Sequence, residues 1–221
     1  MFPPILIESL TRAGVVAVLT IENADDAVPV ARALAEGGVS AIELTFRTPT
    51  AAESLRRIRT ELPDLVVGAG TILDRLQLET AGRAGAVFAV APGCNPSTLR
   101  AAQAAGLPFA PGVATPTDIE VAVEHGCRLV KYFPAETAGG LKHLAVMHAP
   151  FAHLGLRYIP LGGVGPETLA DYLRSPLIAA VGGSWLARPE VIRRRDWAEI
   201  TRAAAAAMAV VRAVREGAGG G

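Results

Sequence analysis

The chain has 221 residues, of which 51% are hydrophobic and 19% charged, and its formal net charge is zero. Balanced charge argues against broad binding to nucleic acid or anionic membranes, since both need a basic patch. The two cysteines, Cys94 and Cys127, lie far apart, so we expect neither a disulfide framework nor a cysteine-rich metal site. No segment has the pattern of a targeting peptide or a membrane span, which favours a soluble, cytoplasmic protein.

Short apolar runs rich in strand formers alternate with helix-like segments along the whole chain. Strands joined by helical crossovers pair in parallel, so the alternation predicts a parallel sheet. The predicted strands cover residues 15–20, 41–46, 66–71, 86–91, 109–113, 129–133, 157–161 and 179–181. Thr50 with Glu53, and Thr117 with Glu120, have the spacing of capping boxes and predict helix starts at these positions.

Eight strand–helix units in a chain of this length favour an α/β fold, namely a compact (β/α)8 TIM barrel. An open, doubly wound sheet is the alternative. No linker rich in proline, glycine or serine divides the sequence, so we expect residues 1–221 to form a single domain. An extra N-terminal helix over residues 5–13 would cover the bottom of the barrel, and residues 216–221 are expected to form a flexible tail.

One predicted strand, residues 129–133, carries a lysine within an apolar run. Side chains alternate along a strand, so Lys131 shares a face with Leu129 and Phe133 and must bury its stem. Burial lowers the pKa of a lysine, and a neutral amine can attack a carbonyl to form a Schiff base. The chain contains two lysines against nineteen arginines, and arginine cannot perform this chemistry. A lysine that reaches the strand end or pairs with a carboxylate is the structural alternative.

Residues 41–46 alternate apolar and polar side chains, and Glu43 and Arg47 fall on the polar face. In a barrel, one face of each strand packs against the helices and the other points inward. The apolar face suits the helices, which leaves a carboxylate and a guanidinium inside, where charges are costly unless they are used or paired. We interpret Glu43 as a proton shuttle and Arg47 as an anion binder, with a structural Glu43–Arg47 pair as the alternative.

Glycine-rich turns follow several predicted strands. Glycine lets a ligand approach the backbone, and Thr71 after Gly68-Ala69-Gly70 adds a hydroxyl, although this turn and Pro92-Gly93 are weak signals alone. Gly162-Gly163 and Gly183-Ser184 are stronger as a pair, because the loops after strands seven and eight of barrels frequently bind phosphate. The four histidines have no convincing ligand spacing, so we expect no metal site.

These candidates lie late in, or just beyond, their strands, on the face where barrel active sites are built. They supply an amine, a proton shuttle, a carboxylate or phosphate binder and a phosphate-binding loop. The combination predicts Schiff-base chemistry on a phosphorylated keto acid. A phosphate-binding isomerase or epimerase that uses no imine, and a non-catalytic module that binds a phosphorylated metabolite, stay open as alternatives.

The chain also resembles the 2-keto-3-deoxy-6-phosphogluconate and 4-hydroxy-2-oxoglutarate aldolases, a family of class I enzymes. The resemblance extends over residues 15–186, and the order and spacing of its short motifs make the joint match specific. The motifs are Glu-Gly-Gly-Val at 36–39, Ile-Glu-Leu-Thr-Phe-Arg-Thr at 42–48, Gly-Ala-Gly-Thr at 68–71, Ala-Pro-Gly at 91–93, Pro-Gly-Val at 111–113, Val-Lys-Tyr-Phe-Pro-Ala-Glu at 130–136, Gly-Gly-Val at 162–164 and Gly-Gly-Ser-Trp-Leu at 182–186.

The resemblance implies a role for each matching residue. Lys131 is similar to the Schiff-base lysine, and Glu43 is similar to the general acid/base. The positions implied to bind substrate are Arg47, Thr71, Pro92, Phe133, Gly162, Gly163, Gly183 and Ser184. The resemblance also implies a cytoplasmic homotrimer without metal or other cofactor, whose partner is a small phosphorylated keto acid that it cleaves to pyruvate and glyceraldehyde 3-phosphate.

Two positions depart from the family pattern. Leu161 stands where the gluconate-type enzymes usually have a threonine that faces the hydroxylated part of the substrate. Its absence favours 2-keto-3-deoxy-6-phosphogalactonate, 4-hydroxy-2-oxoglutarate or relaxed specificity as the alternative. Thr20 stands where some relatives have arginine, which removes a possible anion contact.

Overall fold

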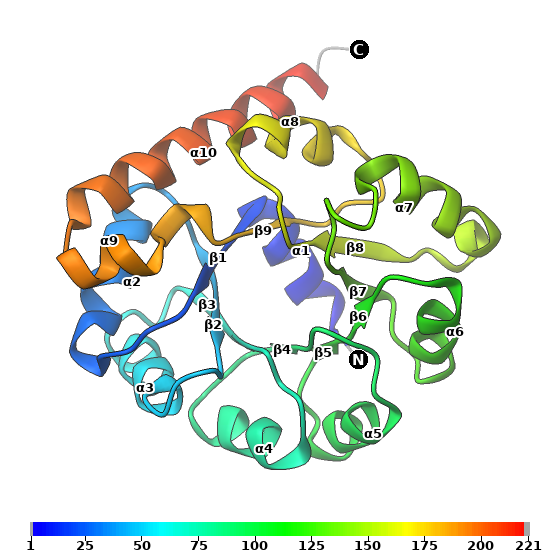
Figure 1. Cartoon of the computed structure of the whole chain (residues 1–221), viewed down its shortest axis with the longest axis horizontal. Coiled ribbons are helices and arrows are strands. Elements are labelled where there is room, and N and C mark those ends of the chain that lie inside the picture. Colours follow the sequence, from blue (N-terminus) through cyan, green and yellow to red (C-terminus); the bar gives the residue numbers. More distant parts are fainter. Residues whose placement is uncertain (1, 219–221) are drawn as a thin grey trace.

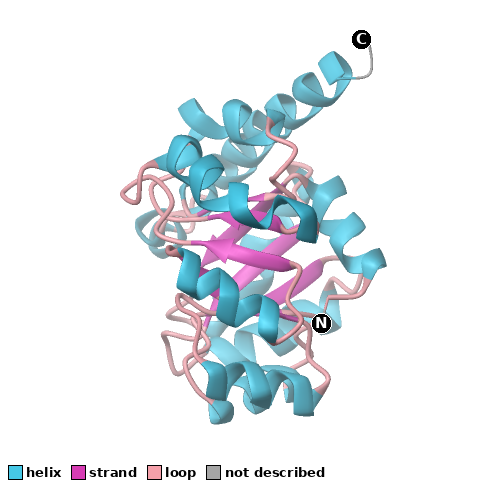
Figure 2. Ribbon diagram, turned by 90° about the vertical axis from the view of Figure 1, so that its right-hand side faces the viewer, coloured by secondary structure: helices cyan, strands magenta, loops and turns pink. Residues whose placement is uncertain are grey.

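The structure, a computed structural model, describes residues 2–218. Its helices form an outer layer around a curled sheet whose strands run through the centre of the molecule (Figure 1). The strands pair in parallel, which confirms the α/β class and the predicted direction of pairing. Seen from the side, the strands are enclosed by helices (Figure 2).

The parallel strands belong to two sheets. Six strands form one sheet in the order β5-β4-β3-β2-β1-β9, and three form a second in the order β6-β7-β8. The strands are β1 (Val15–Leu19), β2 (Ala41–Thr45), β3 (Val66–Gly70), β4 (Ala89–Val90), β5 (Phe109–Ala110), β6 (Gly112–Val113), β7 (Leu129–Tyr132), β8 (Arg157–Pro160) and β9 (Val181–Gly183). The predicted strand 109–113 is divided at Pro111, because proline has no N–H to donate to a ladder.

Helices connect successive strands, as the alternation predicts. They are α1 (Pro4–Ala13), α2 (Ala27–Glu36), α3 (Ala51–Glu61), α4 (Arg75–Arg83), α5 (Pro96–Ala105), α6 (Pro116–Glu124), α7 (Gly140–His148), α8 (Pro166–Arg174), α9 (Pro189–Arg194) and α10 (Trp197–Ala218), with short 3-10 helices η1 (Ala24–Asp26), η2 (Ala149–Leu154) and η3 (Trp185–Ala187). The extra N-terminal helix is confirmed as α1. Residues 216–218 of the predicted tail end α10, and residues 219–221 lie outside the described residues. No described helix is both long and apolar enough to cross a membrane.

Neither predicted capping box forms, although the predicted helix start at Thr50 is confirmed. Thr50 precedes α3 without capping it, because its hydroxyl donates to the carbonyl oxygen of Ile21 at 2.7 Å. Helix α6 begins earlier than predicted, and its capping box is formed by Thr115 and Asp118. Pro116 occupies the first turn of this helix, where proline lacks only an N–H that would have no partner within the helix.

Apolar side chains form two clusters, one on each face of the strands. Val130 and Tyr132 belong to the outer cluster between strands and helices. Leu129 belongs to the inner cluster, together with Leu10 of α1 and Phe88. The alternation along β7 is therefore the predicted one. Because α1 and the inner cluster fill the end of the curled sheet where the strands begin, polar residues can gather at the opposite end.

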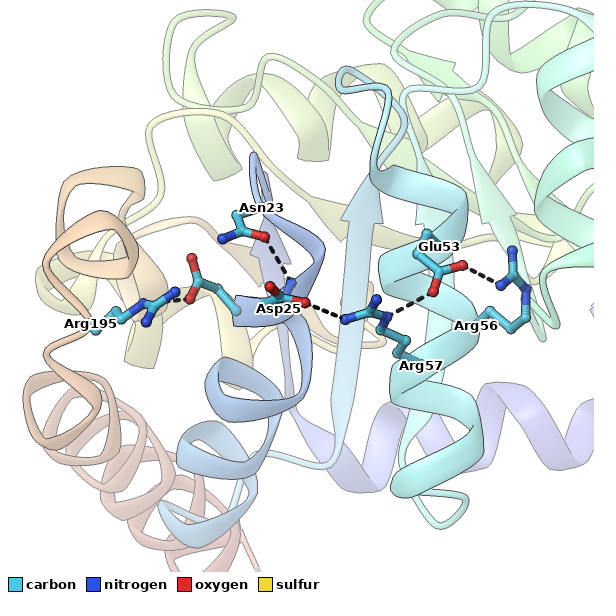
Figure 3. Close-up of polar contacts among 7 residues, drawn as sticks. Asn23, Asp25, Glu53, Arg56, Arg57 and Arg195 are labelled. Atoms are coloured by element: carbon cyan, nitrogen blue, oxygen red, sulfur yellow. Dashed lines mark hydrogen bonds and ion pairs between the residues drawn. The ribbon is translucent and has the colours of Figure 1, made fainter.

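Polar contacts hold the loop after β1 between two helices (Figure 3). On one side, Arg57 of α3 lies 2.7 Å from both Asp25 and Glu53. On the other, Arg195, which follows α9, lies 2.8 Å from the largely buried carboxylate of Asp26. The loop at the carboxyl end of β1 is thus fixed by ion pairs to elements distant in sequence.

Candidate active site

A lysine and a carboxylate from two distant strands meet inside the curled sheet. Lys131 of β7 is 5% exposed and Glu43 of β2 is 2% exposed. The Nζ atom of Lys131 donates to Oε1 of Glu43 at 3.1 Å. Nζ also lies 5.4 Å from the ring centroid of Phe133, which covers the amine with an apolar surface. An enclosed amine with an acid/base group in contact is the arrangement that imine formation needs.

Gly70, at the end of β3, makes room for this carboxylate. A Cβ atom at Gly70 would overlap the Glu43 side chain, including Oε1. The next residue, Thr71, has a φ of 59°, which is unusual for a β-branched residue. Backbone conformations of this kind cluster at functional sites. The end of β3 therefore accommodates Glu43 and turns Thr71 toward the same space.

A cavity of about 320 Å³ opens at this end of the sheet. Its wall contains nine of the ten residues predicted to form the site, namely Glu43, Arg47, Thr71, Pro92, Lys131, Phe133, Gly162, Gly163 and Ser184. Gly183 is not part of this wall, since its Cα faces the ring of Trp185 and the neighbouring Gly182 lines the cavity instead.

Four further lining residues were not singled out as site residues by the sequence: Val18, Thr45, Val164 and Gly182. Thr45 could have been found, because strand alternation places it on the same face as Glu43 and Arg47. The hydroxyls of Thr45 and Thr20 lie 2.9 Å apart, so Thr20 contacts the site through a lining residue. Leu161, the other departure from the family pattern, lines the cavity directly and is 5% exposed.

Arg47 provides a positive charge at the cavity mouth. The Glu43–Arg47 pair considered as an alternative is not formed, because Glu43 contacts Lys131. The Arg47 side chain is exposed, and within residues 2–218 it forms no ion pair. Its guanidinium can therefore meet a carboxylate or phosphate with its full set of donors.

The loop between β8 and α8 offers main-chain donors to the cavity. Gly162 and Gly163 have φ values of 93° and 84°, a conformation that glycine adopts without strain. Among the described residues, no hydrogen bond is donated by the amides of Gly162, Gly163 or Val164. Helix α8 starts immediately afterwards, at Pro166. Free amides that precede a helix N-terminus suit an anionic group such as phosphate.

Other reactive side chains do not compete with Lys131 as nucleophile. Burial raises the pKa of the Cys94 thiol to about 12 and that of Cys127 to about 11, so neither is a thiolate at neutral pH. His148 is buried in contact with the hydroxyl of Tyr158 at 3.1 Å, outside the cavity wall. Within the part of the chain that is described, no three histidine, cysteine, aspartate or glutamate side chains are placed to hold a metal ion.

Comparisons with known proteins identify a matching family. A family model described as KDPG and KHG aldolase matches residues 6–203. A 2-dehydro-3-deoxy-phosphogluconate aldolase of Haemophilus influenzae is 41% identical over 197 residues, which cover 89% of this chain and 92% of that protein.

Two solved structures extend the comparison to the fold. A KDPG aldolase from Legionella pneumophila, with pyruvate captured as a covalent carbinolamine intermediate, has a TM-score of 0.86 at 34% identity and covers 91% of this chain and 97% of that chain. The 2-keto-3-deoxy-6-phosphogluconate aldolase of Zymomonas mobilis with 3-phosphoglycerate has a TM-score of 0.84 at 40% identity and covers 91% and 94%.

Proposed function

The chain belongs to the KDPG and KHG aldolase family and is a carbon–carbon lyase that releases pyruvate through a Schiff base, and on this premise we propose which residues carry the reaction and which substrate it takes. Lys131 forms the Schiff base and Glu43 transfers the protons. The substrate is 2-keto-3-deoxy-6-phosphogluconate or a close phosphorylated relative. The observation that carries the assignment is the 3.1 Å contact between the two buried groups at the floor of the cavity.

The covalent step starts at the amine. Lys131 must attack the C2 ketone of the keto acid in its neutral form, and Glu43 is in place to accept the proton that the amine gives up. Attack forms a carbinolamine, and loss of water gives an iminium ion. The iminium can accept an electron pair from the neighbouring carbons, which makes it the electron sink for the next step.

Cleavage follows from the same pair of residues. Glu43, directly or through a water molecule, removes the proton from the C4 hydroxyl, and the electrons of the C3–C4 bond move into the iminium. Glyceraldehyde 3-phosphate leaves, and an enamine remains on Lys131. Protonation of the enamine at C3 and hydrolysis of the imine then free pyruvate and restore the amine.

The remaining lining residues position the two ends of the substrate. Arg47 and Thr71 bind the carboxylate next to the ketone, while Pro92 and Phe133 enclose the reacting carbons. The phosphate binds at the opposite wall, to the amides of Gly162 and Gly163 and to the loop of Gly183 and Ser184. Arg47 follows β2 and the glycine-rich loop follows β8, and these strands belong to different sheets around one cavity, which supports this orientation.

Leu161 favours a second candidate substrate. Its apolar side chain lines the cavity where a hydroxyl would otherwise meet the hydroxylated part of the substrate. A wall without a hydrogen-bond partner discriminates weakly between sugar epimers. 2-Keto-3-deoxy-6-phosphogalactonate and the shorter 4-hydroxy-2-oxoglutarate are therefore the alternatives, and a panel containing both epimers, 4-hydroxy-2-oxoglutarate and glyoxylate decides between them.

We also infer that the two sheets close into one eight-stranded (β/α)8 barrel that forms a single domain. Residues 109–113 contribute to both sheets, which joins them on one side. On the other side, Tyr158 of β8 pairs in parallel with Ile178, shortly before β9. The homotrimer and the cytoplasmic location implied by the family resemblance stay predictions, and sedimentation analysis tests the first.

The assignment of Lys131 is tested by trapping the imine. Borohydride reduction in the presence of pyruvate should leave a stable pyruvyl adduct on Lys131, located by peptide mass spectrometry. Lys131→Ala should lose both the adduct and aldol cleavage. Lys142→Ala, which removes the other, exposed lysine, is the matched control and should retain both. Undiminished cleavage by Lys131→Ala contradicts the mechanism.

A further inference from the structure

A carboxylate and a phenol lie behind the Gly162-Gly163 loop and have no part in the chemistry above. Glu136 follows β7 and accepts a hydrogen bond from the hydroxyl of Tyr172 on α8. The Tyr172 side chain is 1% exposed, and Glu136 is half-buried. A tyrosine hydroxyl buried among apolar residues needs a partner, and here that partner is a single carboxylate.

Glu136 is in direct contact with the loop. A Cβ atom at Gly163 would lie 2.7 Å from Cβ of Glu136 and 3.1 Å from its Cγ. Glycine at this position therefore lets the loop backbone rest on the Glu136 side chain. The amide of Glu136 also donates to the carbonyl oxygen of Gly162 at 2.9 Å. Side chain and main chain of one residue thus support both glycines.

The bond to Tyr172 fixes the other end of the same loop. Helix α8 begins at Pro166, directly after the loop, and Tyr172 lies within this helix. A hydrogen bond from Tyr172 to Glu136 consequently holds α8 against the segment that follows Lys131 in sequence. Glu136 therefore contacts the loop directly and, through Tyr172, also fixes the position of α8, the helix that follows the loop.

The hydrogen bond from Tyr172 also keeps the Glu136 carboxylate from competing with the substrate phosphate for the loop amides. The amides of Gly162, Gly163 and Val164 donate no hydrogen bond among the described residues. A carboxylate released beside free N–H donors can bind them itself and repel an incoming anion. Its engagement by Tyr172 prevents this competition.

We propose that the Glu136–Tyr172 hydrogen bond positions the Gly162-Gly163 loop for the substrate phosphate and so sets the preference for phosphorylated over unphosphorylated keto acids. The proposal rests on the phosphate-binding role given to this loop above. Tyr172 and Glu136 are positioning residues, since they act through the loop amides.

The test compares two substrates that differ only in the phosphate, 2-keto-3-deoxy-6-phosphogluconate and its unphosphorylated counterpart 2-keto-3-deoxygluconate. Tyr172→Phe should raise KM for the phosphorylated substrate roughly 3- to 10-fold, the scale of one hydrogen bond. Its kcat, and both constants for the unphosphorylated substrate, should stay unchanged. Tyr158→Phe is the matched control, because it removes another buried tyrosine hydroxyl, one that contacts His148.

Variants of Glu136 keep the test decisive if Tyr172→Phe folds poorly. Glu136→Ala removes the side chain on which the loop rests but leaves no carboxylate to compete, so it should also raise KM selectively, by a smaller factor. Glu136→Gln keeps an acceptor oxygen for Tyr172 and should retain the wild-type preference. An equal effect on both substrates, or none on either, overturns the proposal. A wild-type enzyme without preference for the phosphorylated substrate overturns the phosphate site itself, so the two failures are distinguishable.

Discussion

Nζ of Lys131 and Oε1 of Glu43 lie 3.1 Å apart, although 88 residues separate them in sequence and their strands belong to different sheets. The contact crosses the interior of the curled sheet and does not run between neighbouring strands. The amine and the carboxylate therefore reach the same point of the interior from opposite sides. The predictions below start from this geometry and then turn to stability.

Replacing Glu43 by glutamine should slow the reaction without preventing the covalent step. Glutamine has the same size but cannot accept a proton, and a placed acid/base typically contributes about 10²–10⁴-fold. We expect kcat to fall by this factor while pyruvate is still trapped on Lys131, because the amine remains in place. Glu53→Gln, at a carboxylate of α3 outside the cavity wall, should leave kcat unchanged. Full activity in Glu43→Gln would contradict the acid/base role proposed for this residue.

Gly70→Ala should mimic the loss of Glu43, although it changes no reacting group. The new Cβ would overlap the carboxylate, so Glu43 must move away from Lys131. We expect kcat to fall as in Glu43→Gln, and overpacking to destabilise the protein by roughly 1–3 kcal/mol. Gly82→Ala in α4 meets no atom within 4 Å and serves as the control. Because Gly70→Ala should act by displacing Glu43, it should lower kcat no further in a protein that already carries Glu43→Gln. If the two effects on kcat multiply in the double variant, the explanation is wrong.

Arg195→Ala should destabilise the fold more than Arg57→Ala, although each arginine contacts an aspartate at about the same distance. Arg195 pairs with Asp26, whose side chain is 11% exposed, whereas Arg57 pairs with Asp25, which is 71% exposed. Removing the partner of a largely buried carboxylate leaves it unsatisfied, at about 1–3 kcal/mol. Urea unfolding of both variants measures the difference, and equal midpoints contradict it.

His148 should make stability depend on pH in the weakly acidic range. Burial lowers the pKa of His148, so the unfolded chain binds this proton more readily than the folded protein does. The resulting stability is present above the unfolded pKa of about 6.5 and is lost as pH falls toward the folded value. When the pH is lowered from 7.5 to 5, the Tm of His148→Gln should fall less than the Tm of the wild-type protein. His153→Gln, at an exposed histidine, should retain the wild-type decrease.

The sequence allows the faces of the strands to be predicted because a strand has a side-chain period of two. Lys131 and Glu43 are buried on the inward face for this reason. Local signals were less reliable at element ends. The capping box of α6 forms at Thr115 because Pro116 fits the first turn of the helix, and Pro111 interrupts a strand that looks continuous by its apolar character alone.

The partners of the site residues could not be predicted in the same way. Glu43 and Arg47 share a strand face, which leaves a Glu43–Arg47 pair open as an alternative, but the curvature of the sheet brings Lys131 to Glu43 instead. Glycine at position 70 indicates close approach to the backbone, but the sequence does not show that the side chain of Glu43 is what approaches it. Contacts of this kind depend on how distant strands face one another across the interior, and no local pattern encodes that distance.

The end of the sheet opposite the cavity is filled by α1 and by the inner cluster that includes Leu10 and Phe88. Molecules that enter at the cavity mouth must therefore also depart there. In the mechanism proposed above, the three-carbon fragment is still attached to Lys131 when the aldehyde forms, so the aldehyde should leave first. Turnover is then an ordered uni-bi process, in which pyruvate, as the last product off, inhibits competitively and the aldehyde inhibits noncompetitively.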